Sequence, residues 1–335
     1  MLATTWTTRP ANAQGPWHWG RNGLMLARVV AMALLLATVA RPFIVEAVAP
    51  DDRPAEITEP LPPLHTLDKA AREIFIAGYI SQPFYYRSDV HMKRPDGTDL
   101  RLKRLGWDGD ALYFPIDGGI RSVEWWQPAG FMIDFLHNKA ISRLGNGAHG
   151  RKLKNGVIEE VEASGTWKGQ PAPARMKLTD VFERLEFTHG HNVLIFTPML
   201  RLFQFTPSLK PYIGIGGGFA LPHVEVRHTG EPRETRTNEY QLAGPAAQFV
   251  AGVELRSGKW SYFVEYKFTY AWIAAALTGD ESWKNFNMPG DLLRQFMAWW
   301  RSEPPKLGTL DTRLGAHQVA FGAGYWWERG GRKGK

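Results

Sequence analysis

Residues 316–327 alternate between two kinds of side chain, and this period of two limits what the chain can fold into more than any other feature. In one row of alternate positions the side chains are mostly large and apolar: His317, Val319, Phe321, Ala323 and Tyr325. The other row is small or polar: Gln318, Ala320, Gly322 and Gly324. A strand with one apolar face and one small or polar face, ending in an aromatic cluster, is typical of a membrane β-barrel.

The alternation recurs elsewhere, which favours a barrel over a single unusual strand. Three further segments show it: residues 212–219, 248–255 and 260–270. Ser257-Gly258 is a short hairpin signal between the last two. Glu265 and Lys267 share the face opposite a row of aromatic side chains. Ionised groups are costly in the dry core of a soluble β-sandwich but fit a polar lumen, so we favour the barrel.

The spans that we expect number eight. They are residues 73–90, 118–126, 130–141, 184–202, 210–226, 248–255, 260–272 and 314–327. An even number places both ends of the barrel in the periplasm, and the intervals alternate between long outer loops and short inner turns. The predicted fold is therefore all-β, an eight-stranded antiparallel transmembrane β-barrel with long extracellular loops.

Two of the outer loops differ in their patterns. Residues 142–183 are rich in Lys, Arg, Gly and Pro and show no apolar period. Residues 273–313 are predicted to contain a short helix, because Leu292, Phe296 and Trp299 are spaced at helical intervals. This helix could lie on the outer leaflet or pack over the barrel mouth, and both readings stay open.

The ends of the chain carry targeting and linking segments. Arg21 and Arg28 precede the apolar run 29–40, which predicts an extension and signal peptide over residues 1–40, with an uncleaved anchor as the alternative. Residues 41–72 are rich in Pro and acidic groups and indicate a periplasmic linker. The barrel is then expected over residues 73–327, followed by the basic tail 328–335.

Composition excludes some functions. The chain has no cysteine, so disulfides, thiolate metal sites and a cysteine nucleophile are ruled out. The glycine-rich run 212–219 lacks the third glycine and the following helix of a nucleotide-binding loop. The net charge of +7 suits an acidic partner. No nucleic-acid motif accompanies it, so phosphorylated lipopolysaccharide, which a barrel meets in its own membrane, is the expected partner.

Two polar motifs fall near the outer ends of consecutive spans. One is the run 134–139, Asp-Phe-Leu-His-Asn-Lys, and the other is the run 188–192, Thr-His-Gly-His-Asn. Antiparallel pairing would gather a carboxylate and imidazoles there, which suits a divalent metal such as iron or zinc, or acid–base catalysis. Strand parity places Asp134 and His137 on opposite faces, so one metal could take both only across a bulge. The alternative is a set of polar loop-base residues without chemistry.

Glu265 offers a further carboxylate. We expect it to pair with Lys267 or with a cation on a neighbouring strand rather than to act in catalysis.

An ordered set of short motifs resembles the outer-membrane lipid A oxidase family of alpha-proteobacteria. The motifs lie at residues 88–100, 106–109, 118–122, 130–139 and 190–192. The resemblance spans about residues 73–327 and departs from the family pattern at residues 115–117, in the leader and in the tail. It implies an eight-stranded barrel and an oxygen-dependent oxidation of the proximal glucosamine of lipid A to aminogluconate, assisted by a divalent metal.

The resemblance and the motifs together assign expected roles. The catalytic set is Asp134, His137, His191 and Asn192; the metal set is His137, His191 and Asp134; the substrate-binding set is Lys139, Arg151, Lys152 and Arg175. The expected cofactors are a divalent metal, with iron as a candidate, and molecular oxygen. The expected partners are lipid A, the outer membrane and the barrel assembly machinery, for a monomeric protein without nucleic acid in a Gram-negative cell. The alternatives are a non-enzymatic structural or porin-like barrel and a lipid A deacylase.

Overall fold

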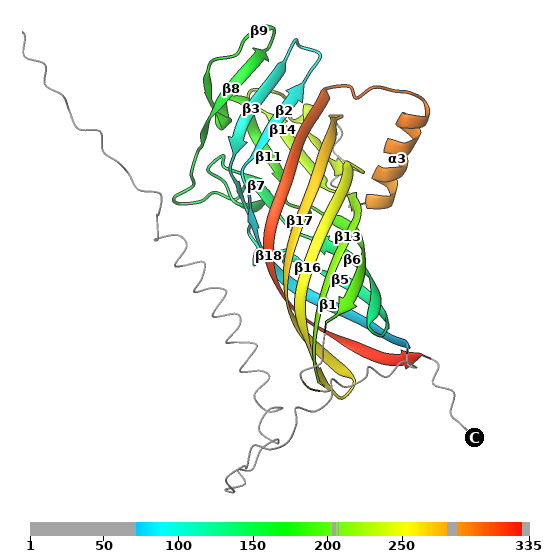
Figure 1. The fold of residues 1–335 in the computed structure, drawn as a ribbon. Coiled ribbons are helices and arrows are strands. Elements are labelled where there is room, and N and C mark those ends of the chain that lie inside the picture. The colour runs from blue at the N-terminus through cyan, green and yellow to red at the C-terminus, as the bar shows by residue number, and fades with distance from the viewer. Residues whose placement is uncertain (1–71, 203–205, 207, 280–286, 330–335) are drawn as a thin grey trace, which may run out of the picture. The chain divides into compact units, whose positions relative to one another are not determined.

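A computed structural model describes residues 72–202, 206, 208–279 and 287–329, all within the compact unit 61–335. Eight of its strands close into an antiparallel barrel, in which each strand pairs with its neighbour and the last pairs with the first (Figure 1). In barrel order they are β1 (Arg72–Tyr85), β5 (Gly118–Trp126), β6 (Ala129–His137), β12 (Val193–Arg201), β13 (Leu209–Ala220), β16 (Gly244–Ser257), β17 (Trp260–Leu277) and β18 (Gly308–Arg329). The predicted eight-stranded antiparallel barrel is confirmed.

The expected leader and almost all of the expected linker lie outside the described residues, as does the tail beyond Arg329. The barrel itself begins at Arg72, which pairs with Arg329 at its other end. The short turns between β5 and β6 and between β16 and β17 lie at this same end. The opposite end carries all the additional strands and is called the outer end below (Figure 1).

Side chains alternate across the barrel wall as the sequence predicts. On β17, Tyr262, Val264 and Tyr266 face outward and are exposed, whereas Glu265 and Lys267 face inward and are fully buried. The outward rows form an apolar surface around the barrel, which is the pattern of a transmembrane β-barrel. Among the described residues, no helix combines the length and the apolar character needed to cross a bilayer.

The lumen is filled by ion pairs. Arg121 donates to Glu265 at 2.7 Å, and its guanidinium lies 3.5 Å from the centre of the Phe263 ring. Lys267, the partner expected from the sequence, lies 3.4 Å from the same carboxylate. Nearer the inner end, Arg201 bridges Glu73 at 2.6 Å and Glu254 at 3.0 Å. Charges buried in this way need partners on several sides, and the network holds strands from around the whole barrel together.

Four of the expected spans are each divided between two strands, and the span 73–90 divides between β1 and a strand at Ser88–Lys93. The expected spans 130–141, 184–202 and 210–226 leave the barrel at their outer parts. Those parts form three strands of a separate five-stranded sheet, and two strands from between the spans complete it. The order is β15 (Thr237–Tyr240), β14 (His223–His228), β11 (Phe182–Phe187), β7 (Ala140–Ser142) and β4 (Trp107–Asp108). The physical reason is a break in each span, clearest at Gly190, whose φ is +125°, and at Pro222.

A second outer layer extends from the barrel wall. Its strands are β2 (Ser88–Lys93), β3 (Asp99–Leu105), β8 (Glu160–Trp167), β9 (Gln170–Pro171) and β10 (Arg175–Lys177). The layer joins the barrel where β2 pairs with the start of β18. The segment 142–183 is therefore more ordered than its sequence indicates, because Val161, Met176 and Val181 bury apolar side chains there. It also contains η2 (Ala148–Gly150) and α2 (Leu178–Val181), and η3 (Arg233–Thr235) follows β14.

The helix expected in residues 273–313 is present as α3 (Met288–Trp300). Asn287 caps its first turn by accepting a hydrogen bond from the backbone of Gly290 at 3.1 Å. The helix contacts β15 and lies outside the barrel near its outer end (Figure 1).

Candidate functional site

Asp134 lies inside the barrel, away from the outer loops. Its carboxylate accepts a hydrogen bond from the Tyr79 hydroxyl at 2.7 Å and pairs with the ammonium of Lys267. Gln248 donates to the same carboxylate at 3.4 Å. Strand parity directs the His137 side chain to the other face of β6. A carboxylate already paired with a buried ammonium has little capacity left for a metal ion.

His137, His191 and Asn192 lie at the outer end of the barrel, where β6 ends and β12 begins. Nδ1 of His137 lies 2.9 Å from the side-chain oxygen of Asn192. Nδ1 of His191 lies 3.2 Å from the Tyr85 hydroxyl, and burial lowers the pKa of His191 to about 4. Nε2 of each of the two histidines is buried without a hydrogen-bond partner in the described part of the chain. Each of these neutral rings therefore has one nitrogen available to bind a ligand.

The structure therefore does not assemble the expected metal set of Asp134, His137 and His191. Among the described residues, these three do not form a group of metal-ligating atoms within reach of one another. The reason is the alternation of β6, which sends Asp134 into the lumen to meet Lys267. The catalytic roles expected for Asp134, His137, His191 and Asn192 stay predictions.

The expected substrate-binding cations divide into one buried and three outer residues. Lys139 is fully buried and pairs with Asp117, whose pKa burial raises to about 6 against the opposing effect of Lys139. Arg151 pairs with Asp110 at 2.6 Å. The others are exposed: Lys152, and Arg175, which pairs with Glu160.

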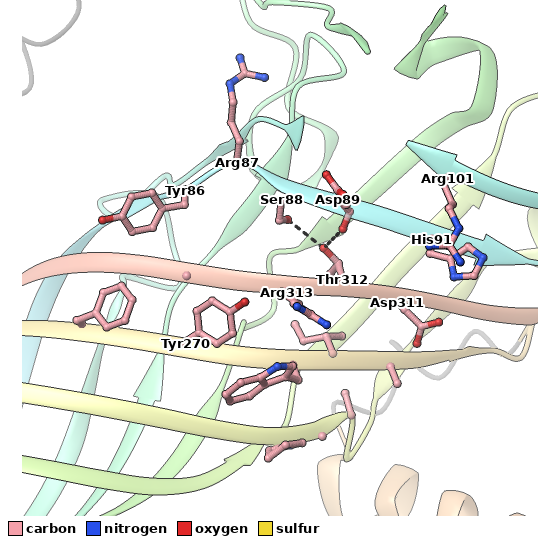
Figure 2. Close-up of a pocket in the computed structure, with 18 residues that line it drawn as sticks. Tyr86, Arg87, Ser88, Asp89, His91, Arg101, Tyr270, Asp311, Thr312 and Arg313 are labelled. Carbon is pink, nitrogen blue, oxygen red and sulfur yellow. Dashed lines mark hydrogen bonds between the residues drawn. The ribbon is translucent and has the colours of Figure 1, made fainter. Parts of the chain in front are cut away.

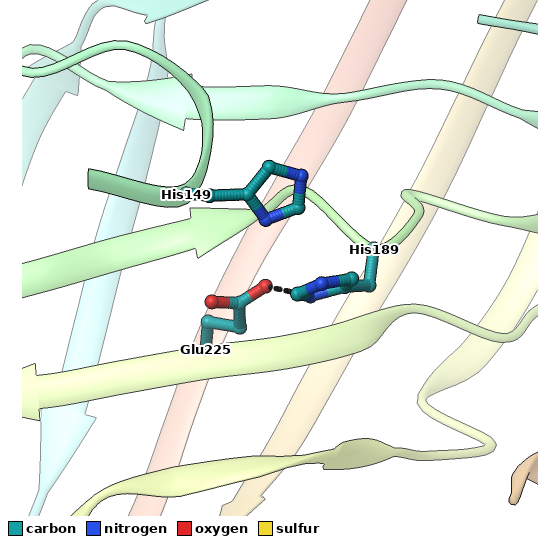
Figure 3. A group of neighbouring side chains, drawn as sticks. All are labelled: His149, His189 and Glu225. Carbon is teal, nitrogen blue, oxygen red and sulfur yellow. Dashed lines mark hydrogen bonds and ion pairs between the residues drawn. The ribbon is translucent and has the colours of Figure 1, made fainter. Parts of the chain in front are cut away.

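A different group of ligating side chains gathers above the barrel. Among the described residues, His149, His189 and Glu225 form one group in which the ligating atoms all lie within 4.8 Å of one another (Figure 3). Nδ1 of His189 lies 2.5 Å from Oε1 of Glu225, and the rings of His149 and His189 are 4.2 Å apart. His149 comes from η2, His189 follows β11, and Glu225 lies in β14.

The backbone at His149 is unusual. Its φ of +56° lies in the left-handed region, which a residue other than glycine occupies at an energetic cost. The conformation turns the imidazole toward Glu225 from a segment far away in the sequence (Figure 3). Such strain persists only where the surrounding structure imposes it, and it is common at functional sites.

The two oxygens of Glu225 have different neighbours. Oε2 accepts hydrogen bonds from Arg184 at 3.0 Å and from Arg236 at 2.8 Å. Oε1 lies on the side of the imidazoles, with Nδ1 of His223 at 3.5 Å and the Thr188 hydroxyl donating at 2.8 Å. The two guanidiniums orient the carboxylate, as supporting residues orient metal ligands in many proteins.

Electrostatics keep Glu225 ionised. Burial alone would raise the pKa of Glu225, but hydrogen bonds with His189 and His223 hold it well below its ordinary value. Burial also lowers the pKa of His149 to about 4, so that ring is neutral at physiological pH. An ionised carboxylate beside a neutral imidazole is the state in which such groups bind metals.

Two histidines and one carboxylate are the donor set of mononuclear iron sites that activate oxygen, and the set also binds zinc. His189 was within the patch that the sequence indicates, but His149 and Glu225 were missed. One signal was available for Glu225. In the run His223-Val224-Glu225 the two polar residues share one face of a strand, which is the face turned to the cluster.

A groove lies on the side of the barrel at its outer end (Figure 2). It has a volume of about 1020 Å³ and opens between the start of the β2–β3 hairpin and strands β16 to β18. Its aromatic residues are Tyr86, Phe268, Tyr270 and Trp272. Its arginines are Arg87, Arg101 and Arg313. Among the described residues, Arg101 and Arg313 form no ion pair, and the carboxylates Asp89 and Asp311 line the same groove.

No known protein-family model matches the chain, and no curated protein matches it. Among solved structures, the outer membrane protease OmpT from Escherichia coli is similar over 79% of this chain and 100% of its own, with 8% identity and a TM-score of 0.30. The CymD monoaromatic hydrocarbon channel is similar over 76% of this chain and 88% of its own, with 7% identity and a TM-score of 0.18. Likeness of this extent assigns neither a family nor an activity.

Proposed function

We propose that this protein is an outer-membrane enzyme that modifies lipid A, and that the modification is an oxygen-dependent oxidation of the proximal glucosamine to aminogluconate. The observation that carries the proposal is the cluster of His149, His189 and Glu225 above the barrel. The motif resemblance described above supplies the substrate and the reaction. The cell compartment is the outer membrane of a Gram-negative bacterium, which the barrel would enter through the barrel assembly machinery as a monomer.

The residues of the cluster fit a divalent metal on chemical grounds. Oε1 of Glu225 and one nitrogen each of His149 and His189 would hold the ion, while Arg184 and Arg236 keep the carboxylate oriented through Oε2. Three protein ligands leave other positions open, which an oxygen-using site needs. When bound, divalent iron would supply the redox chemistry with molecular oxygen.

The reaction balances with oxygen as the only oxidant. A proximal glucosamine with a free hydroxyl at C1 loses two hydrogens to oxygen, which yields a lactone and hydrogen peroxide. Water then opens the lactone to the carboxylate, so the product carries one more oxygen atom than the substrate. Glu186 is a candidate for the proton transfers, because burial and the charge of Glu225 raise its pKa to about 8.

The groove supports a lipid substrate. Its aromatic side chains face outward at the end of the lipid-facing rows of β17, where acyl chains and sugars of a membrane lipid would lie. Arg101 and Arg313 stand at the same opening and could bind phosphate groups. The expected outer cations Arg151, Lys152 and Arg175 would then contact the headgroup from the side of the loops.

One experiment separates the candidate functions. Lipid A from cells with and without the gene, grown with and without oxygen, would be compared by mass spectrometry. We expect an oxygen-dependent gain of one oxygen atom. Loss of an acyl chain would support a deacylase instead, and an unchanged spectrum would support a structural barrel. The matched variants are His189→Ala, which should abolish the gain, and Val264→Ala, an exposed position on the lipid-facing side of β17 outside the groove, which should retain it.

A non-enzymatic barrel is the second candidate, and one observation favours it. Glu225 already has two arginine partners, so the cluster could be a stable buried ion network without a metal. Metal content of the purified protein distinguishes the two. A deacylase has weaker support, because among the described residues no serine hydroxyl forms a hydrogen bond with a histidine; Ser261, for example, donates to Glu254.

A further inference from the structure

The helix α3 has its polar side against the protein and its apolar side turned away. Asp291 is buried and accepts a hydrogen bond from the backbone of Tyr240 at 2.9 Å. Gln295, one turn later, accepts from the backbone nitrogen of Leu242 at 2.8 Å and donates to its carbonyl at 3.1 Å. These contacts attach α3 to the end of β15 through polar groups.

The opposite side of α3 is apolar and exposed. Its residues are Leu293, Phe296, Met297 and Trp300, with Trp299 beside them. They follow the i, i+3, i+4, i+7 spacing of a single helical stripe, half a turn away from the stripe of Asp291 and Gln295. Trp299 and Trp300 are each 71% exposed. A contiguous patch of five large apolar side chains facing water is unfavourable and marks a surface that another apolar phase covers.

The attachment point of α3 places this stripe beside the membrane. Leu242, which Gln295 holds, comes two residues before the start of β16. The outward row of β16 begins there with Pro245 and continues through Phe249 and Val253, which are exposed on the lipid-facing side. The helix α3 is therefore attached just before the outer end of β16 and lies outside the barrel at that end (Figure 1).

We propose that α3 lies in the interfacial region of the outer leaflet and inserts its apolar stripe among the lipids. Tryptophan prefers this depth, where its ring is buried and its N–H stays near water. Arg301, which follows the helix, is exposed and lies 3.8 Å from the equally exposed Glu303; a pair this open to water can exchange its carboxylate for a lipid phosphate. The inference concerns attachment to the membrane and does not depend on the proposed oxidation.

The absence of cysteine makes the proposal directly testable. Trp299→Cys would carry an environment-sensitive fluorophore in protein folded into phospholipid vesicles that contain a nitroxide-labelled acyl chain. The matched control is Gln170→Cys, an exposed position in β9 at the far end of the outer hairpin layer (Figure 1). Heat-modifiable migration on gels would show that both variants are folded barrels.

We expect nitroxide lipids to quench the probe at position 299 several-fold more strongly than the probe at position 170. Equal quenching at the two positions would overturn the proposal. The vesicles would contain on average less than one protein molecule each, so that a second copy cannot cover the apolar stripe of α3. A different result would show that α3 docks on another copy instead. In that case nitroxide lipids would not quench the probe at this low density, and the probe's emission would shift to the blue only at high protein density. Adding Trp300→Asp and Phe296→Ser should reduce the quenching at position 299 while β-barrel folding is kept.

Discussion

The ammonium of Lys267 on β17 pairs with the carboxylate of Asp134 on β6, directly across the barrel. The two strands are four places apart in a ring of eight, so the pair bridges the full width of the lumen. Tyr79 adds to the bridge, since its hydroxyl accepts from Lys267 at 2.9 Å and donates to Asp134 at 2.7 Å. A charge pair in this position joins opposite walls.

Removing one partner of this pair should destabilise the barrel strongly. Lys267→Met leaves the Asp134 carboxylate buried without its cation, which typically costs about 3–5 kcal/mol. The double variant Asp134→Leu with Lys267→Met leaves no unpaired charge at Asp134 and should be more stable than the single variant. The midpoint of urea unfolding, followed by heat-modifiable gel migration, measures both. A double variant less stable than Lys267→Met would contradict the pairing.

The protein should not conduct ions. An eight-stranded barrel leaves only enough interior for side chains, and here Arg121, Glu265, Arg201 and Glu254 occupy it. Recordings in planar bilayers should show no steady open level. A reproducible conductance typical of a porin would show that the ion-pair network opens in the membrane.

Metal binding should distinguish the cluster in the outer sheet from the motif residues at the barrel rim. We expect His189→Ala and Glu225→Gln to lower the bound metal, measured by elemental analysis, by about tenfold or more. Each variant alters a side chain that would hold the ion, and loss even of a residue that only supports a ligand costs about tenfold or more. His191→Ala is the matched control, since it removes a neighbouring imidazole outside the cluster. If bound metal were instead lost only in His191→Ala and His137→Ala, the result would support the metal-binding residues expected from the sequence.

Phosphorylated lipid should bind through the arginines of the groove. The double variant Arg101→Gln with Arg313→Gln removes two cations that have no ion-pair partner among the described residues, and we expect affinity for phosphorylated lipid A to fall about tenfold. Lys103→Gln is the control, since this cation lies on β3 outside the groove. Equal binding of phosphorylated lipid A by both variants would show that the arginines of the groove do not bind the substrate.

The outer strands should loosen as the pH falls. Burial lowers the pKa of His228 to about 4 from 6.5, and Arg94 lowers it further, against the opposing charges of Glu231 and Asp96. Above pH 6.5 the ring is neutral in both states; between 6.5 and 4 only the unfolded chain takes up the proton, so stability is lost as pH falls. The free energy of unfolding falls by about 3 kcal/mol over this pH range.

Limited proteolysis of the folded barrel at pH 7 and pH 4.5 would detect this loosening. Cleavage within the outer strands should increase at the lower pH, and His228→Gln should reduce the increase. An identical pH response in the variant would assign the effect to other groups.

The barrel was predictable from the sequence because its signal is local. Each strand shows its period of two within about ten residues, and the expected span 118–126 coincides with β5. The outer continuations were harder, because a strand that leaves the barrel keeps the same alternation. Gly190 and Pro222 were available as break signals, whereas nothing in the pair Asn138-Lys139 indicates that the chain turns away there.

The site was less predictable because it depends on contacts between distant segments. The motif at residues 134–139 contains a carboxylate and an imidazole, but the partner of Asp134 is Lys267, which no local pattern connects to it. Glu225 and His149 come together only through the five-stranded sheet and through the left-handed backbone of His149. Residue type and spacing indicated the region of the chemistry but not its ligands.

The length of β18 also governs the order of assembly. This strand of 22 residues closes the barrel against β1 and, at its other end, provides the edge on which β2 and the outer hairpin layer are built. The outer layer therefore cannot complete its pairing before the barrel has its final wall, and any surface that this layer helps to form becomes complete only in a protein whose barrel can close.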